Sequence, residues 1–285
     1  MREALIFGGS GQIGRPLLQR LQRQDWRITA LSRQPQRDGD GVQWLRGDLA
    51  ALPPLPARVD AVISCGPLDA FAQWYGSAAA IETARVIAFG STSVEVKRDS
   101  ADASERDLAR RLREGEAGVF ATAQARGAAA TLLRPTLVYG AGRDATLTRI
   151  ASIARRFGWF PLPRDAGGLR QPVHVEDLAD AAMQAIDVVA SHGHAYALPG
   201  GETLPYREMV ARVLATLQPP ARLVELPAPL FRLAVQAARI SGRAPDLGNA
   251  ALQRMRDDLV FDATPATHDF AYAPRRFIPE APMFE

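Results

Sequence analysis

The 285-residue sequence predicts an α/β fold, namely a doubly wound parallel sheet followed by a smaller α/β region. Two observations lead to this class. Short apolar runs rich in Val, Ile, Leu and Phe alternate with helical patterns through the first half, which is typical of a parallel sheet that is buried on both faces. In addition, a glycine-rich turn follows the first apolar run directly and opens a helix.

The predicted strands of the first half are ALIFGG, WRITALS, VQWLRGD, DAVISCG, ARVIAFGS and AATLLRPTLVYG. A helix is expected from about residue 15 to residue 23, after the first strand. The stretch ALPPLPARVD is a connection, because its prolines remove hydrogen-bond donors and block a helix. Ser104 and Asp107 form a Ser-x-x-Asp capping box, which predicts another helix that begins near Glu105.

Composition and charge exclude several classes of protein. The 34 basic and 31 acidic side chains give a net charge of +3, and the arginines are scattered, which argues against a nucleic-acid partner. A single cysteine, Cys65, forms no internal disulfide, and His192 and His194 lack a third ligand nearby, so we expect no bound metal. No run of about 18 apolar residues occurs. We expect a cytoplasmic protein without a membrane partner, and its oligomeric state stays open.

The glycine turn predicts a dinucleotide site. Gly8 allows the tight turn, Gly11 lets the backbone approach a pyrophosphate, and Gly14 lets the helix pack close to the sheet. The helix N-terminus then offers free N–H groups to the phosphates. The doubly wound sheet is therefore predicted to be a Rossmann fold. The predicted cofactor residues of this turn are Gly8, Ser10, Gly11, Gln12, Ile13 and Gly14.

The cofactor type depends on the end of the second strand. An NAD site usually has an acidic residue there for the ribose hydroxyls, whereas this strand ends in Ser32 and Arg33. Since a guanidinium pairs well with a 2′-phosphate, NADP is favoured and NAD is the alternative, although Arg33 could equally be a solvated loop residue. Asp48, after the third strand, is expected beside the adenine.

Several motifs in their order and spacing resemble the extended and atypical short-chain dehydrogenases, and among them the NAD-dependent epimerase/dehydratase family. The residues that carry the resemblance are GGSGQIG at 8–14, RGDL at 46–49, IAFGSTSVE at 87–95, LLRPTLVYGAG at 132–142, RQPVHVEDLADA at 170–181 and YALPGGETLPYREMV at 196–210. The resemblance implies an NAD(P)-binding Rossmann domain over residues 1–140. It implies a mainly substrate-binding region, a smaller C-terminal α/β domain, over 141–285, with a segment near 170–200 that returns to the Rossmann sheet.

The resemblance also locates a missing catalytic pair. In the family, Ser91 would hydrogen-bond the reacting oxygen, and the next helix would carry Tyr-x-x-x-Lys, in which the lysine lowers the pKa of the tyrosine. Counting back from Arg134 as in the family places this pair at Leu108 and Leu112, which are inert. Lys97 is the sole lysine, so the standard pair occurs nowhere in the chain.

Other family segments supply candidate site residues. Arg134 and Pro135 match a segment that passes beside the nicotinamide. Arg170 and His174 match the lining of the substrate cleft, where arginine often meets a diphosphate; His174 could equally be a hydrogen-bonded interior histidine. Tyr139, which forms Tyr-x-x-x-Arg with Arg143, is a candidate for proton transfer, but its glycine-rich surroundings need not place the two on one face.

Two functions remain open from the sequence. One is an NAD(P)-dependent enzyme of the epimerase/dehydratase kind, acting on a sugar nucleotide or a similar polar small molecule with its proton handling reassigned. The other is an NADP(H)-binding sensor or assembly protein without redox turnover. The retained glycine turn and Ser91 favour the enzyme, whereas the loss of the tyrosine and lysine disfavours it.

Overall fold

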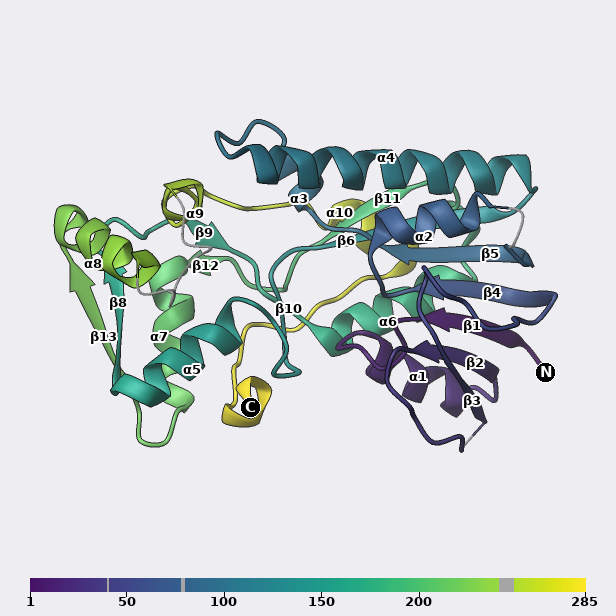
Figure 1. Cartoon of the computed structure of the whole chain (residues 1–285), viewed down its shortest axis with the longest axis horizontal. Helices are drawn as coiled ribbons and strands as arrows, with labels where there is room; N and C mark the ends of the chain where they lie inside the picture. The colour runs from purple at the N-terminus through teal and green to yellow at the C-terminus, as the bar shows by residue number, and fades with distance from the viewer. Residues whose placement is uncertain (40, 78–79, 241–248) are drawn as a thin grey trace.

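A seven-stranded parallel sheet forms the centre of the larger part of the molecule (Figure 1). The computed structural model describes residues 1–39, 41–77, 80–240 and 249–285. The strand order is β11-β6-β5-β4-β1-β2-β3, and neighbouring strands are parallel. The strands are β1 (Glu3–Phe7), β2 (Arg27–Ser32), β3 (Val42–Arg46), β4 (Arg58–Ser64), β5 (Glu82–Phe89), β6 (Ala129–Pro135) and β11 (Ala195–Leu198). The predicted doubly wound Rossmann fold is thus confirmed.

Helices cover both faces of this sheet, because the strands bury apolar side chains on both sides. One face carries α1 (Gly14–Arg23), α6 (Val175–Ile186) and α10 (Thr264–Phe270), and the other carries α2 (Leu68–Tyr75) and α4 (Ala103–Ala125). A short helix, α3 (Ser93–Val96), joins β5 to α4. The order of the strands reverses between β1 and β4, and such folds bind their ligands at the strand ends beside this point.

Helix α4 begins two residues earlier than the capping box predicts. Asp102 is its N-cap, since the Asp102 carboxylate accepts a 2.8 Å hydrogen bond from the backbone N–H of Ser104. Asp107, the expected capping partner, instead pairs with Arg110 and Arg111 on the outer surface of the helix. The predicted capping box is therefore wrong, because an aspartate two positions before Ser104 competes better for the free N–H groups.

A second group of elements lies beyond the carboxyl ends of the sheet strands (Figure 1). Its own core lies around α5 and α7. The helices are α5 (Leu147–Phe157), α7 (Tyr206–Thr216), α8 (Ala228–Ile240) and α9 (Asn249–Arg254), with the 3-10 turn η2 (Ala281–Phe284). Three strand pairs accompany them: β7 (Val138–Tyr139) with β10 (Val173–His174), β9 (Leu169–Arg170) with β12 (Leu204–Pro205), and β8 (Trp159–Pro163) with β13 (Arg222–Leu226). A further 3-10 turn, η1 (Val189–Ser191), belongs to the larger part, where it joins α6 to β11. The domain boundary at residue 140 stays a prediction.

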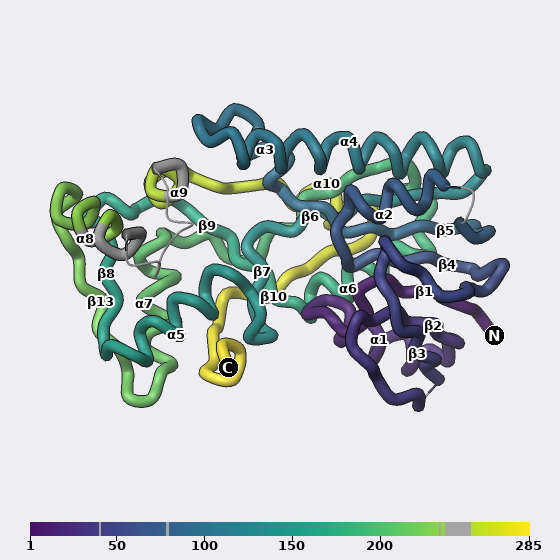
Figure 2. The backbone as a smooth tube through the Cα atoms, in the orientation of Figure 1, coloured from purple at the N-terminus to yellow at the C-terminus, as the bar shows by residue number. Residues whose placement is uncertain are grey.

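The C-terminal segment runs back along the molecule, as the yellow tube in Figure 2 shows. Two contacts fasten it to the larger part. The Tyr272 hydroxyl donates to the carbonyl of Pro199 at 2.7 Å, and the buried Asp177 carboxylate accepts from the backbone and side chain of Arg275. Further along this segment, Phe284 is buried in the core around α5 and α7.

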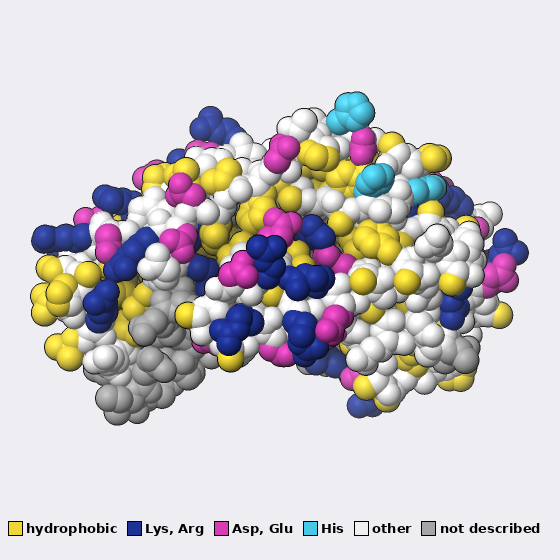
Figure 3. Space-filling view, turned by 90° about the horizontal axis from the view of Figure 1, so that it is seen from above, with side chains coloured by type: hydrophobic (Ala, Val, Ile, Leu, Met, Phe, Trp, Pro, Cys, Tyr) yellow, Lys and Arg dark blue, Asp and Glu magenta, His cyan; other side chains and the backbone are white. Residues whose placement is uncertain are grey.

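The face of the molecule seen in Figure 3 carries basic and acidic side chains interspersed rather than in blocks of one sign. This distribution agrees with the scattered arginines of the sequence. Among the described residues, no helix combines the length and the apolar character that a membrane crossing requires.

Candidate functional site

The glycine turn between β1 and α1 has the geometry of an anion cradle. Gly8 adopts φ +73°, a backbone conformation that residues other than glycine rarely adopt. A Cβ on Gly14 would stand 2.2 Å from the carbonyl oxygen of Gly8, so only glycine lets α1 start this close to β1. The N–H of Gly11 closes the turn onto the Gly8 carbonyl at 2.9 Å.

Backbone N–H groups at the start of α1 are available to a ligand. Ile13 is at the N-cap position of α1, and its apolar side chain accepts no hydrogen bond from the first turn of the helix. Within the described part of the chain, the N–H groups of Gln12 and Ile13 make no hydrogen bond. The buried side-chain oxygen of Gln12 is also without a partner there. Free donors at a helix N-terminus, at the point where the strand order reverses, are suited to a pyrophosphate.

The end of β2 places a cation beside the glycine turn. The hydroxyls of Ser10 and Ser32 lie 3.0 Å apart, so the turn and the end of β2 are in direct contact. Arg33 follows at once, and its exposed guanidinium has no partner among the described residues. A free guanidinium at this position is able to pair with a phosphate on the adenosine ribose.

Asp48 lies after β3, as expected, but its carboxylate shapes the local turn. One of its oxygens accepts hydrogen bonds of 3.0 Å from the N–H groups of both Ala50 and Ala51. Its other oxygen accepts no hydrogen bond from the described residues.

The ends of β5 and β6 bring two predicted residues together. Ser91 follows β5 and is half-buried, and its hydroxyl accepts a 3.1 Å hydrogen bond from the N–H of Ser93 at the start of α3. The carbonyl of Pro135 at the end of β6 accepts from both the N–H and the hydroxyl of Thr92. These contacts hold Ser91 at the carboxyl edge of the sheet, close to Pro135.

Arg134 is held between two carboxylates. Its Nε and Nη2 donate to the two oxygens of Glu116, at 2.7 and 2.6 Å, and its Nη1 donates to Glu95 at 3.0 Å. Glu116 is buried, whereas the Glu95 side chain is 56% exposed. Burial acts to lower the pKa of Arg134, but the hydrogen bonds and charges of Glu116 and Glu95 raise it overall, so the guanidinium stays charged.

Leu108 and Leu112 lie on the same face of α4 as Glu116, because the three residues are four positions apart. Both leucines are half-buried, and Leu112 packs against the core on the α2 side of the sheet. Lys97 lies 3.6 Å from Glu105 in an ion pair that also includes Arg254. Neither position on α4 therefore offers a proton donor.

Tyr139 is enclosed rather than exposed to a cleft. It belongs to β7, is 1% exposed, and packs edge-on against the rings of His174 and Phe277. Burial raises the pKa of Tyr139 to about 12. Arg143 instead donates from Nη1 to the carbonyl of Ser10 at 2.9 Å. The four-residue spacing of Tyr139 and Arg143 thus does not form a pair, and this placement does not favour proton transfer by Tyr139.

His174 caps helix α6. Its Nδ1 accepts a 3.2 Å hydrogen bond from the N–H of Glu176, so in the neutral ring the proton lies on Nε2. Nε2 is buried against Gly140 and has no partner among the described residues. Burial lowers the pKa of His174. These contacts favour the interior, structural role over a direct contact with substrate.

Arg170 is 5% exposed and donates to backbone carbonyls. Its Nη1 donates to Leu169 and Asp257, its Nη2 donates to Arg254, and the guanidinium lies 5.2 Å from the ring centre of Tyr206. The side chain thus fastens the end of α9 and the segment after it to β9. This arrangement favours a structural role over the binding of a substrate anion.

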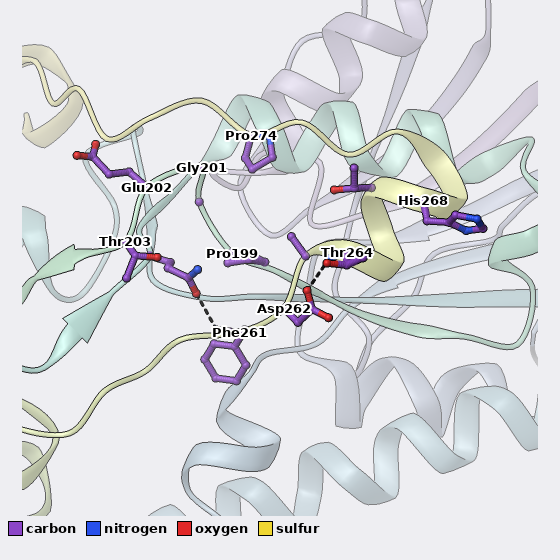
Figure 4. Close-up of a pocket in the computed structure, with 13 residues that line it drawn as sticks. Pro199, Gly201, Glu202, Thr203, Phe261, Asp262, Thr264, His268 and Pro274 are labelled. Atoms are coloured by element: carbon purple, nitrogen blue, oxygen red, sulfur yellow. Dashed lines mark hydrogen bonds between the residues drawn. The ribbon is translucent and has the colours of Figure 1, made fainter.

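A pocket opens beyond the carboxyl end of β11 (Figure 4). It is lined by the loop that contains Pro199, Gly201 and Glu202 and by the segment from Phe261 to His268. Gln171 accepts from the N–H of Phe261, and Asp262 accepts from that of Thr264. These polar side chains therefore already serve the backbone.

Sequence reasoning missed Glu95 and Glu116. The signal for Glu116 was available, since it stands four residues after Leu112 on the face that would carry the catalytic pair. No signal in the sequence pairs either glutamate with Arg134, because that pairing joins residues 39 and 18 positions apart.

Comparisons with known proteins agree with this geometry. Residues 4–88 match the model of the NAD dependent epimerase/dehydratase family. A 2-alkyl-3-oxoalkanoate reductase of Stenotrophomonas maltophilia is 28% identical over an alignment of 320 positions, gaps included. The alignment covers 97% of this chain and 96% of the reductase.

Solved structures share the fold. An epimerase of Methanothermobacter thermautotrophicus has a TM-score of 0.71 at 15% identity and covers 96% of this chain and 88% of its own. MoeE5, solved in complex with UDP-glucuronic acid and NAD, has a TM-score of 0.69 at 17% identity, covering 96% of this chain and 94% of its own.

Proposed function

We propose that the chain, whose residues 4–88 match the model of the NAD dependent epimerase/dehydratase family, is an NAD(P)-dependent oxidoreductase or epimerase acting on a polar small molecule. The observation that carries the proposal is the glycine turn with its free N–H groups at the point where the strand order reverses. Ser91, at the neighbouring strand ends, would hydrogen-bond the reacting oxygen.

The cofactor is proposed to be NADP(H) rather than NAD(H). Arg33 supports this choice, because its guanidinium is exposed and has no partner among the described residues, and because β2 ends in Ser32 and not in an acidic residue that could receive ribose hydroxyls. When bound, the nicotinamide would supply or accept a hydride. The chain itself would bind the phosphates at Gln12 and Ile13 and would orient the substrate oxygen at Ser91.

The substrate class rests on the relatives alone. One relative is named a 2-alkyl-3-oxoalkanoate reductase, and the structure of MoeE5 was solved with UDP-glucuronic acid. Both molecules carry an anionic group together with an oxo or hydroxyl carbon. We therefore propose an anionic oxo or hydroxy compound, either an oxo acid or a sugar nucleotide.

A second candidate function is an NADP(H)-binding sensor or assembly protein without turnover. The leucines at 108 and 112 and the enclosed Tyr139 favour it, because the usual proton relay has no counterpart in these positions.

One experiment separates the candidates. The purified protein is titrated with NADPH and NADH by calorimetry, and its oxidation of NADPH is then followed with 3-oxooctanoate and with a UDP-4-keto sugar. Binding of NADPH with turnover of either compound supports the enzyme, and binding without turnover supports the sensor. Absence of binding by both cofactors would overturn the proposed function.

A further inference from the structure

We infer that Arg134 is the binding residue for the anionic group of the substrate, and that Glu95 occupies its place in the free protein. The inference deepens the proposed function and rests on it. Its starting point is the position of Arg134 at the end of β6, one residue before Pro135 and across from the end of β5 that leads to Ser91.

The two carboxylates around Arg134 differ in their surroundings. Glu116 holds the Nε and Nη2 side of the guanidinium in a two-pronged pair, and the exposed fraction of its side chain is only 7%. Such a pair fixes the plane and direction of the guanidinium. Breaking it would leave a buried charge, so Glu116 acts as a positioning residue.

Glu95 occupies the opposite, outer side. Among the described residues, its carboxylate accepts one hydrogen bond, from Nη1 of Arg134 at 3.0 Å, and its side chain is 56% exposed. Because the Glu95 carboxylate is more than half exposed, water and salt screen its attraction to Arg134 more than that of the buried Glu116. A ligand that brings its own carboxylate or phosphate can therefore displace Glu95 at little cost.

The charge balance favours such an exchange. Arg134 faces Glu116 on one side, so the outer position holds one anion in the free protein. Replacing the Glu95 carboxylate by a carboxylate or phosphate oxygen of the ligand keeps the number of charges at the guanidinium unchanged. Leu108 and Leu112, respectively two turns and one turn before Glu116 on α4, bring no competing charge.

The anionic group has two sources that share this chemistry, the carboxylate of an oxo acid and the diphosphate of a sugar nucleotide. Calorimetry with 3-hydroxyoctanoate and with UDP-glucose distinguishes them, and the neutral methyl ester of the hydroxy acid serves as a comparison. Each titration is run on the whole chain, with and without saturating NADPH.

The variant Glu95→Gln removes the internal competitor and lies on the surface, so it should fold. We expect it to bind one of the two anions about three- to tenfold more tightly than the wild type and to bind the methyl ester unchanged. The control is Glu114→Gln, which removes the exposed carboxylate that pairs with Arg110 on α4. It should change the affinity for neither of the two anions. The inference would be overturned if Glu95→Gln and the wild type bound both anions with the same affinity. The same holds if neither protein bound either anion.

A second variant tests Arg134 itself. Since Arg134→Met alone would strand the buried Glu116, the double variant Glu116→Gln with Arg134→Met removes both charges. It should lose at least about tenfold in affinity for the anion that Glu95→Gln binds more tightly, with a circular dichroism spectrum like that of the wild type. Retained affinity in a folded double variant contradicts the inference. A wild-type protein that does not bind NADPH would instead count against the proposed function. In that case the titrations without cofactor still test whether Arg134 binds the anion.

Discussion

Arg143 and Ser10 are 133 positions apart in the chain, and the Nη1 of Arg143 donates a 2.9 Å hydrogen bond to the carbonyl of Ser10. This bond joins the loop after β7 to the glycine turn. The loop is itself held by the C-terminal segment, because the N–H of Gly142 donates to the carbonyl of Met283. The glycine turn near the N-terminus is thus linked, through the loop after β7, to the C-terminal segment.

Replacing Arg143 by alanine should weaken NADPH binding by about threefold to tenfold, since the glycine turn loses a charge-assisted hydrogen bond that restrains it. Calorimetric titration measures the change. Arg156→Ala removes an exposed arginine from α5, far along the chain from the turn, and serves as the control. Identical affinities of Arg143→Ala and the wild type would show that the turn is rigid without this bond.

Replacing Arg33 by alanine should reduce the affinity for NADPH by about tenfold or more and leave that for NADH within about twofold, because only NADPH carries the 2′-phosphate. The exposed Arg37, four residues later, offers a matched control as Arg37→Ala. A parallel loss of both cofactors in Arg33→Ala would assign the residue to the fold of the loop.

Replacing Arg170 by alanine should lower the free energy of unfolding by about 2–4 kcal/mol, because carbonyls of the segment after α9 lose a buried donor. Urea unfolding measures this change. The control is Arg207→Ala, at a half-exposed arginine whose partner is Glu225. It should lower the free energy of unfolding by less than about 1 kcal/mol. An Arg170→Ala protein of unchanged stability but weaker substrate binding would restore the anion-binding role expected from the sequence.

The double variant Leu108→Tyr with Leu112→Lys should fold and bind NADPH within about twofold of the wild type, because both positions are half-buried and have access to solvent. Thermal unfolding and cofactor titration test this. Val119→Lys, at a fully buried position of the same helix, should fail to fold and marks the contrast. Collapse of the double variant would show that residues 108 and 112 are core positions.

Stability should fall as the pH drops below about 6.5, in part through His174. Burial holds the pKa of His174 below its ordinary value of 6.5, so the unfolded chain binds a proton that the folded protein excludes. The contribution of His174 is complete above pH 6.5 and is lost as the pH falls from there through the lowered pKa. His174→Asn, which keeps a capping side chain, should flatten the dependence measured by urea unfolding at several pH values.

His192 requires a parallel measurement, since burial also lowers its pKa. The variant His192→Asn should change the slope less than His174→Asn does, because His174 is the more buried of the two. If His174→Asn left the pH dependence as in the wild type, the histidine would not be the group responsible.

The sequence by itself determined the sheet, the glycine turn and the absence of the usual tyrosine and lysine. These features are local: apolar runs specify buried strands, Gly8 and Gly14 are required by backbone geometry within a few residues, and a missing side chain is visible without a structure.

The partners of the charged and polar side chains were decided only by the tertiary structure. Arg170 was expected to face a substrate and instead holds backbone carbonyls, and Arg134 proved to lie between Glu95 and Glu116. With 34 basic and 31 acidic residues in the chain, composition leaves many pairings open. A pairing is selected by which side chains packing removes from water, because an ion buried without a partner is costly, and that depends on contacts between segments far apart in sequence.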